Sequence, residues 1–578
     1  MVVVSWARAT SSSRRAAQIA AFLGADVESI VLDPAPGASR ALPRSACLIV
    51  DADTIVAAGR EMSGGENALL AELAAGAEHL FVHGFTESHA ATLRLLTGDA
   101  LGGVEALDAE VRFSVTGDRQ WCGPFTGLSV PVPTSVHEAR FVERSDDPRL
   151  DVMIRANGDP FLARTSLYGS QLFLSAAAEF ADLDERVGRE TPVLSCFSRL
   201  IPLMMFLRGA LGRRLWHNDK PQACFIVDDP YLKKDRYGFL EYEKLLTSMR
   251  RLSYATCIAF IPWNHRRSSR RVAERYFSRT GATLCIHGCD HTRGEFLTGD
   301  LHALRAKAET ALARMQDHTR RSGVAFDDVM VFPQGLFSTQ AVAALKAAGY
   351  LAAVNSNPVP STVPDGLALR EWLDVAVSRF SDFPVFGRRY PREIAEFAFD
   401  LFLGRPILAV EHHGYFQSGY TDLETFVTRL NALDERIDWT GLGAICSRAC
   451  VTRTDERGDV HVRFYTDRFL LSNDTDHPRR YLLMRQLSRG HGVSSVTVND
   501  RVWPSTCEER TVGFEISLAA GETAHVRLRS TTGVEASPWR TPAMYATKAM
   551  IRRHLSDFRD NHVDTSRFLS ALISARRD

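Results

Sequence analysis

The chain has 578 residues, of which 45% are hydrophobic and 24% charged, an ordinary composition for a globular protein of about three or four domains. Its formal net charge is zero and its pI is near 7.3, so no charge imbalance points to nucleic acid or to an anionic membrane surface. No apolar run reaches the ~20 residues of a membrane span, and the N-terminus indicates a strand, a loop and a helix rather than a signal peptide. We therefore expect a cytoplasmic protein with no membrane span and no nucleic-acid partner; export and oligomeric state stay open.

Residues 1–215 predict an α/β domain whose later part is rich in β-strands. Four apolar runs, with helical segments such as 62–77 between them, predict buried parallel strands: "VVVSWA", "SIVLD", "ACLIVD" and "HLFVHG". This pattern resembles the flavodoxin-like domain of class I amidotransferases. The nucleophile motif of that family, G-x-C-x-G, is absent, so we expect a non-catalytic domain that acts as a scaffold or as a glycan-binding surface.

Residues 216–445 alternate between strands and helices and predict a (β/α)7 barrel or a doubly wound sheet. In such folds polar functional residues gather at the carboxyl ends of the strands, and here those ends carry Asp-Asp, His-Gly, Pro-Gln-Gly, Asn-Ser-Asn and Glu-His-His. The expected strands are 223–229, 255–262, 282–288, 329–335, 351–357, 375–380 and 407–414.

The remainder of the chain predicts two smaller parts. Short alternating segments with turn residues between them predict a small antiparallel β-sandwich over 446–535. Residues 536–578 follow as a helical tail, with a helix expected over 543–577 that packs back on the protein.

Two strand ends bring together residues that favour a metal site. An apolar strand delivers Asp228 and Asp229 together, and two adjacent carboxylates without a cation are costly to bury. The stretch "IHGCDH" places His287 and His291 four residues apart, and imidazoles with one carboxylate form a common ligand set for Zn²⁺ and similar ions. The spacing alone is uninformative, since "HLFVH" (79–83) has it too within an apolar run.

The two motifs together resemble those of the NodB-type polysaccharide deacetylases, which are related to carbohydrate esterase family 4. The resemblance covers about 220 residues and implies that Asp228 is the general base. It implies that Asp229, His287 and His291 bind a divalent metal, with Zn²⁺ expected first and Co²⁺, Ni²⁺ or Mn²⁺ as alternatives. "HGCDH" has Gly where the family has Ser or Thr after the first His.

The other family motifs match less well. "VFPQG" has Val331 where the family has the Arg that pairs with the catalytic Asp; Arg293 and Arg379 are candidates to replace it. "LAVEHH" resembles the motif whose His acts as general acid, with His412 as the first choice and His413 as the second.

The implied substrate is an N-acetylated amino sugar or a polysaccharide that contains one. The turn Pro333, Gln334 and Gly335 is expected to line the substrate groove and to offer a backbone N–H to the oxyanion. The aromatic side chains of Trp263 and Tyr415 are expected to stack on the sugar. The sequence thus predicts a hydrolase, a metal-dependent carbohydrate deacetylase that acts on an amide C–N bond.

Two alternatives remain open from the sequence. A metal-independent glycoside hydrolase needs two carboxylates roughly 5–9.5 Å apart, so Asp228 would need a partner such as Asp374 or Glu411. A catalytically silent glycan-binding or assembly protein is the other alternative, which the missing motif Arg favours.

Overall fold

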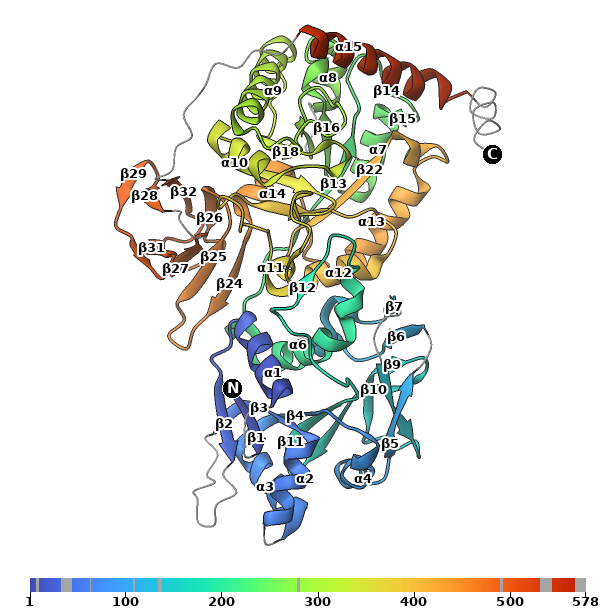
Figure 1. Ribbon diagram of the computed structural model, residues 1–578, viewed down its shortest axis with the longest axis vertical. Coiled ribbons are helices and arrows are strands. Elements are labelled where there is room, and N and C mark those ends of the chain that lie inside the picture. Colours follow the sequence, from blue (N-terminus) through green and yellow to red (C-terminus); the bar gives the residue numbers. More distant parts are fainter. Residues whose placement is uncertain are drawn as a thin grey trace. The chain divides into compact units, whose positions relative to one another are not determined.

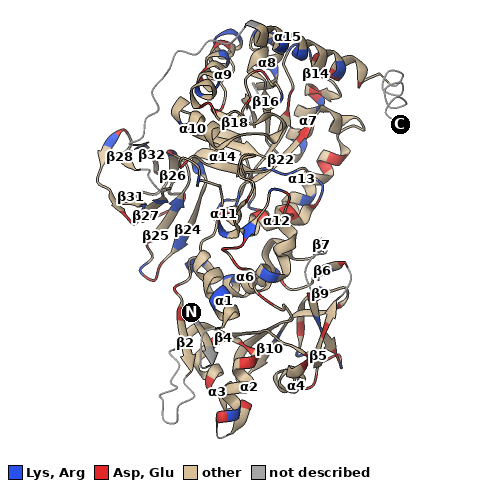
Figure 2. Cartoon of the chain, in the orientation of Figure 1, with Lys and Arg blue, Asp and Glu red and all other residues tan. Residues whose placement is uncertain are grey.

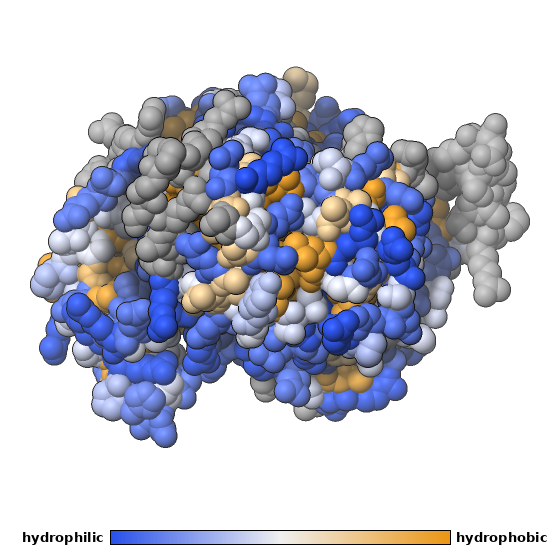
Figure 3. Space-filling model, turned by 90° about the horizontal axis from the view of Figure 1, so that it is seen from below, coloured by the Kyte–Doolittle hydropathy of each residue, from blue (hydrophilic) through white to orange (hydrophobic). Residues whose placement is uncertain are grey.

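The computed structural model describes residues 1–6, 10–32, 44–62, 64–107, 110–133, 138–277, 281–488, 492–530 and 543–566. The chain divides into two compact units (Figure 1). The first comprises residues 1–217 with the short segments 368–370 and 453–457, and the second comprises the rest of the chain from 218 onward. Figure 2 shows acidic and basic residues interspersed on both units. The face seen in Figure 3 is mostly hydrophilic, with small hydrophobic groups between the polar ones.

The first unit is built on a sheet in the order β2-β1-β3-β4-β11-β10-β9-β6-β7. The first five strands in this order pair in parallel: the four that the buried apolar runs predict, and β11, which they do not; the remaining pairs are antiparallel. The strands of the whole unit, of which β5 and β8 form a separate pair, are β1 (Val2–Trp6), β2 (Glu28–Leu32), β3 (Ser45–Asp51), β4 (Ala77–His83), β5 (Leu101–Leu107), β6 (Val111–Val115), β7 (Ser129–Val132), β8 (Glu138–Glu143), β9 (Asp151–Ala156), β10 (Asp159–Leu167), β11 (Ser170–Ser175) and β12 (Arg186–Val187).

The helices of this unit include one that is mostly buried. The segment Val193–Arg214 has the length and composition of a membrane span, with a mean hydropathy of 1.4, yet 72% of that window is buried inside the protein. Such burial is typical of a core helix. The helices are α1 (Ser11–Phe22), α2 (Ala52–Glu61), α3 (Gly65–Gly76), α4 (Ala90–Thr97), α5 (Arg119–Cys122) and α6 (Phe197–Leu211).

The second unit contains a parallel barrel that agrees with the predicted alternation of strands and helices. Its strand order is β21-β19-β18-β17-β16-β13-β22, and a parallel bridge between Arg389 and Ala409 joins the two ends of this order. Six of the seven strands lie where the sequence predicts them. The strands are β13 (Gln222–Asp228), β16 (Thr256–Phe260), β17 (Ala282–His287), β18 (Val329–Val331), β19 (Ala352–Asn355), β21 (Val385–Gly387) and β22 (Ile407–His412).

The sixth strand of the barrel corrects the sequence-based expectation. We expect it over 375–380, but this stretch contributes only an antiparallel bridge from Val377 to Val385. The parallel strand that pairs with β19 is β21, and all three of its registered pairs are parallel. Because β21 is three residues long, it carries too little periodicity to stand out from the preceding apolar run.

Helices and short strands surround the barrel strands. The helices are α7 (Tyr242–Leu252), α8 (Arg270–Phe277), α9 (Leu301–Ser322), α10 (Thr339–Ala348), α11 (Leu369–Leu373), α12 (Ile394–Phe402), α13 (Thr421–Leu433) and α14 (Leu442–Arg448). The short strands are β14 (Arg236–Tyr237), β15 (Leu240–Glu241), β20 (Leu367–Ala368) and β23 (Asp438–Trp439).

After the barrel come a sandwich of two sheets and a C-terminal helix. The sheet orders are β24-β25-β27-β31-β30 and β26-β32-β28-β29; the pairing is mostly antiparallel, but β25 and β27 are parallel. The sandwich strands are β24 (Cys450–Thr454), β25 (Val460–Phe464), β26 (Arg468–Ser472), β27 (Arg479–Gln486), β28 (Val493–Val498), β29 (Arg501–Trp503), β30 (Thr506–Glu508), β31 (Thr511–Leu518) and β32 (Thr523–Ser530).

The C-terminal helix α15 (Ala543–Phe558) continues into a π-helical turn, Arg559–Val563. The helix is thus shorter than the expected 543–577. Residues 567–578 lie outside the described part of the chain.

Candidate active site

Two adjacent carboxylates at the end of β13 point to different partners. Asp228 is the last residue of the strand and is 2% exposed. Asp229 follows it with a φ of 82°, a left-handed conformation that is uncommon for a residue with a Cβ and that Asp and Asn tolerate best. This turn of the backbone separates the two side chains, which relieves the repulsion that both would feel if they shared one site.

Asp229, His287 and His291 converge on one point. The Nε2 atoms of His287 and His291 lie 3.4 and 3.2 Å from Oδ1 of Asp229, and 3.1 Å from each other. This buried Oδ1 accepts no hydrogen bond of good geometry. Three ligand atoms within 4.8 Å of one another and an unsatisfied carboxylate oxygen among them fit a divalent cation.

The ring of His287 is oriented for metal binding through Nε2. Its Nδ1 lies 3.1 Å from the carbonyl oxygen of Val331 on the neighbouring strand β18. A proton on Nδ1 that is donated to this carbonyl leaves the lone pair of Nε2 free for a metal. Burial lowers the pKa of His287, but the charges of Asp228 and Asp229 outweigh this effect and raise it overall.

The loop that carries His291 is held by a buried carboxylate that the sequence does not single out. Glu295 accepts hydrogen bonds from the backbone N–H groups of Cys289, Asp290 and His291, at 2.9, 3.0 and 3.1 Å. A Cβ at Gly288 would lie 2.2 Å from Oε1 of Glu295, so a side chain at this position would collide with the carboxylate that holds the loop. Asp290 is an unsuitable ligand here because it pairs with Arg314 at 2.7 Å.

Asp228 pairs with an arginine that sequence reasoning missed. Arg388 follows β21 and donates from Nη1 and Nη2 to the two carboxylate oxygens of Asp228, each at 2.7 Å. Burial raises the pKa of Asp228, but the charges of Arg388 and His287 and the hydrogen bond from Arg388 outweigh it and lower the pKa overall. Neither candidate named from the sequence does this: Arg379 pairs with Glu371, and Arg293 is exposed.

The two histidines at the end of β22 lie in different places. His412 is the registered neighbour of Asp228 on β13, and its Nε2 is 3.9 Å from Oδ2 of Asp228 with 45% of its side chain exposed. His413 is buried and faces Asp560 and Asp564, at 3.8 and 4.0 Å. Of the two candidate acids, the structure therefore brings His412 to Asp228 and turns His413 away from it.

The expected substrate-contacting residues divide into two groups. The turn Pro333–Gly335 lies beside the loop that carries His291. Within this turn Gln334 is exposed, and the N–H of Gly335 already donates to the carbonyl oxygen of Phe332. Trp263 lies 5.6 Å from the guanidinium of Arg267 and makes a T-shaped contact with His554 of α15, so this ring is engaged within the protein.

Tyr415, the other expected sugar-stacking residue, lies beyond the end of β22. Its half-buried ring is 6.1 Å from that of Phe225.

The carboxylates that a glycoside hydrolase would need are placed unfavourably. Asp374 accepts a hydrogen bond from Tyr465 and pairs with Arg463. Glu411 is registered with Val227, one residue before the Asp228–His412 pair, so its side chain points to the opposite face of the sheet.

Comparisons with solved structures found distant matches that are described as carbohydrate deacetylases. No protein-family model matches the sequence, and no curated protein matches it either. A solved structure described as Agd3, a novel carbohydrate deacetylase, is similar over 92% of this chain and 99% of its own, with 10% identity and a TM-score of 0.44.

Other matches cover a smaller share of the chain. A family 4 carbohydrate esterase from Streptomyces lividans in complex with acetate matches 39% of this chain and 93% of its own (12% identity, TM-score 0.24). A family 4 pseudoenzyme from Bacillus anthracis matches 38% and 64% (10% identity, TM-score 0.25). Scores this low assign neither an activity nor a substrate to the chain; its own residues have to do so.

Proposed function

We propose that this chain is a metal-dependent deacetylase that hydrolyses the N-acetyl group of an amino sugar, free or within a polysaccharide. One observation carries the proposal: the Asp228–Arg388 pair lies beside the Asp229–His287–His291 cluster, and His412 stands next to Asp228. Groups suited to act as a general base, as metal ligands and as an acid therefore occur together at the carboxyl ends of the barrel strands.

The two imidazoles and one carboxylate suit Zn²⁺ first and related first-row ions next. When bound, such an ion supplies a Lewis acid that polarises the acetamide carbonyl and lowers the pKa of a water toward about 7. Asp229, His287 and His291 would supply three protein ligands, the number typical of catalytic rather than structural zinc sites.

The protein's own residues handle the protons. Asp228, kept ionised by Arg388, accepts the proton of the attacking water as the new C–O bond forms. The amide C–N bond then breaks, and the amine needs a proton to leave. His412 is suited to donate it because its exposed side chain can reach a substrate that enters from solvent. The products are acetate and a free amino sugar.

Arg388 also bears on the catalytically silent alternative. That alternative draws its main support from the missing motif Arg, and Arg388 supplies an equivalent charge to Asp228 from a different strand. The bidentate contact keeps the base ionised at neutral pH, which supports turnover rather than binding alone.

The experiment is metal analysis of the purified protein together with acetate release from N-acetylhexosamine monomers and oligomers. We expect about one divalent ion per chain and acetate release that a chelator abolishes. His287→Ala should lose both the metal and the activity, whereas His302→Ala, which removes an exposed histidine on α9, should retain both. Full activity of His287→Ala or of the chelated protein would disprove the proposal, and release of reducing ends without acetate would favour a glycoside hydrolase.

A further inference from the structure

The C-terminal segment (residues 543–566) lies across the carboxyl ends of several barrel strands. Tyr545 is within hydrogen-bonding distance of Asp290 and Thr292, at 3.1 and 2.9 Å. Asp557 pairs with Arg267 at 2.5 Å, and Asp560 accepts from Tyr237 at 2.6 Å. These partners follow β17, β16 and β13, the strands that carry or flank the metal ligands. Figure 1 shows α15 on the same side of the barrel as α8 and α9.

One side chain of this segment reaches the metal site itself. Arg553 is 7% exposed, and its Nη2 lies 3.4 Å from Nδ1 of His291 and 3.2 Å from Oγ of Ser556. Its Nε has no hydrogen-bond partner, and its charge interacts with that of Asp229. A buried guanidinium thus lies against one of the histidines that a metal would also need.

The position of Arg553 conflicts with a metal in two ways. Binding through Nε2 requires the proton of His291 to be on Nδ1, and this N–H would then face a guanidinium that can only donate. In addition, a fixed positive charge beside the ligands opposes a divalent cation by Coulomb repulsion. By contrast, Nδ1 of His287 faces a carbonyl oxygen, which suits a bound metal.

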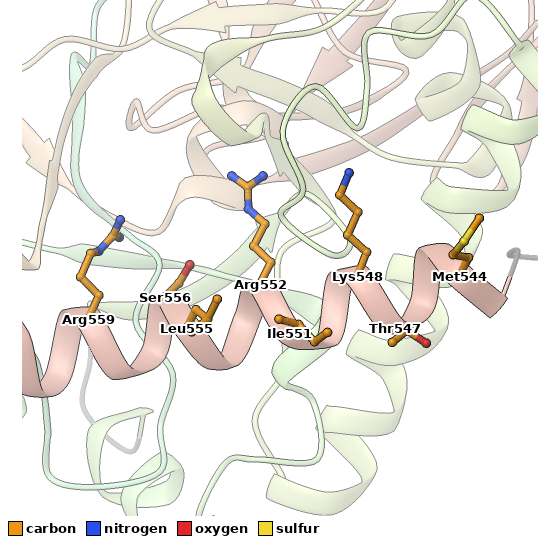
Figure 4. A pocket seen from close by; sticks show the side chains of 8 residues that line it. All are labelled: Met544, Thr547, Lys548, Ile551, Arg552, Leu555, Ser556 and Arg559. Carbon is orange, nitrogen blue, oxygen red and sulfur yellow. The ribbon is translucent and has the colours of Figure 1, made fainter.

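The segment is held mainly by polar contacts and leaves its apolar side chains in water. Ala549 is its buried apolar residue, at 2% exposure, whereas Met544, Ile551 and Leu555 are 85%, 52% and 65% exposed. Figure 4 shows this outer face, where Lys548, Arg552 and Arg559 point to one side of α15. Elements with few buried apolar contacts open at low free-energy cost. We therefore expect the segment to detach from the barrel and bind again at low cost.

We propose that the C-terminal segment is an antagonist of the catalytic metal: Arg553 supplies the positive charge of the metal site while the segment is docked, and metal binding displaces it. This inference rests on the proposed function, because it takes Asp229, His287 and His291 as the metal ligands. By linkage, anything that weakens docking tightens metal binding, and the metal loosens the segment by the same factor.

Zn²⁺ affinity, measured by competition with a chromophoric chelator, tests this without relying on activity. Arg553→Gln should bind Zn²⁺ about 5–150-fold more tightly than the unmodified chain, the usual range of coupling between linked sites. Asp557→Asn weakens docking through Arg267 without touching the metal ligands, and it should shift the affinity in the same direction. The matched control is Lys548→Gln, which removes one positive charge from the exposed face of α15 and should change nothing.

The readouts separate the possible failures. Equal or weaker Zn²⁺ binding by Arg553→Gln overturns the antagonism while leaving the deacetylase proposal intact. Tighter binding by Arg553→Gln but not by Asp557→Asn also overturns it, since Arg553 would then act as a local charge and not through docking. Zn²⁺ binding by none of the proteins refutes the metal site and both proposals with it. Hydrogen exchange of residues 543–563 should increase when Zn²⁺ is added and should stay constant if the segment is a fixed structural element.

Discussion

Arg388→Met removes the cation that keeps Asp228, the proposed general base, ionised. In the unmodified chain two 2.7 Å hydrogen bonds join Arg388 to Asp228, and their side chains are 4% and 2% exposed. Water therefore neither screens the pair nor replaces it. Removing one partner of such a pair costs about 3–5 kcal/mol of stability, because the other charge stays buried without compensation.

The same substitution should change the pH dependence. The pKa of Asp228 lies below its ordinary value of 3.8 because Arg388 and His287 outweigh the effect of burial. Its contribution to stability is thus present above the ordinary pKa and is lost as the pH falls through the folded-state pKa. Without Arg388, burial raises the pKa, so the acid limb of kcat/KM moves to higher pH. The stability difference should be largest at neutral pH and shrink in acid, where Asp228 is protonated in both proteins.

Urea unfolding at several pH values and a pH profile of acetate release provide the assay. Arg379→Met is the control: its ion pair with Glu371 is 47% and 30% exposed, so it should cost no more than ~1 kcal/mol. The double variant Asp228→Leu with Arg388→Met should regain most of the lost stability, since an apolar pair can replace a buried ion pair. An Arg388→Met protein with unchanged stability and an unchanged acid limb would refute this account of the base.

Three further substitutions test the surroundings of the site. Gly288→Ala places a Cβ 2.2 Å from Glu295 at a φ of +65° and should reduce stability and metal affinity together; Gly299→Ala, with nothing within 4 Å, should reduce neither. Glu295→Gln weakens the hold on the His291 loop, and metal titration should show about a 10–100-fold lower affinity, as for other groups that orient ligands. His412→Ala should lower kcat about 10²–10⁴-fold with unchanged metal content, and metal loss in that variant would make His412 a ligand instead.

Much of the barrel and the positions of the proposed metal ligands could be predicted from the sequence. Long apolar runs such as β13 and β17 are recognisable because both faces of a parallel strand are buried. Once these strands are known to be parallel, the residues after them must meet at one edge of the sheet. Asp229 and His287 could therefore be placed near each other without a structure.

Arg388 and Arg553 could not be found in this way. Arg388 follows a three-residue strand, while the stretch 375–380 imitates a strand better. Its link to Asp228 spans 160 residues, and a single polar contact leaves no periodic signal in the sequence. Arg553 lies on a helix whose apolar side chains face water, so its pattern does not indicate which face packs on the barrel.

The adjacent carboxylates differ in how permanently their charges are neutralised. Asp228 has a fixed partner in Arg388, whereas Asp229 has two imidazoles and, from the C-terminal segment, Arg553. If Arg553 replaces the metal charge, a chelator should lower the Tm of the unmodified chain only slightly. In Arg553→Gln the carboxylate of Asp229 loses its substitute cation, so the same chelator should lower the Tm by several degrees more. Equal shifts in the two proteins, measured by scanning calorimetry, would mean that the charge of Asp229 is satisfied without Arg553.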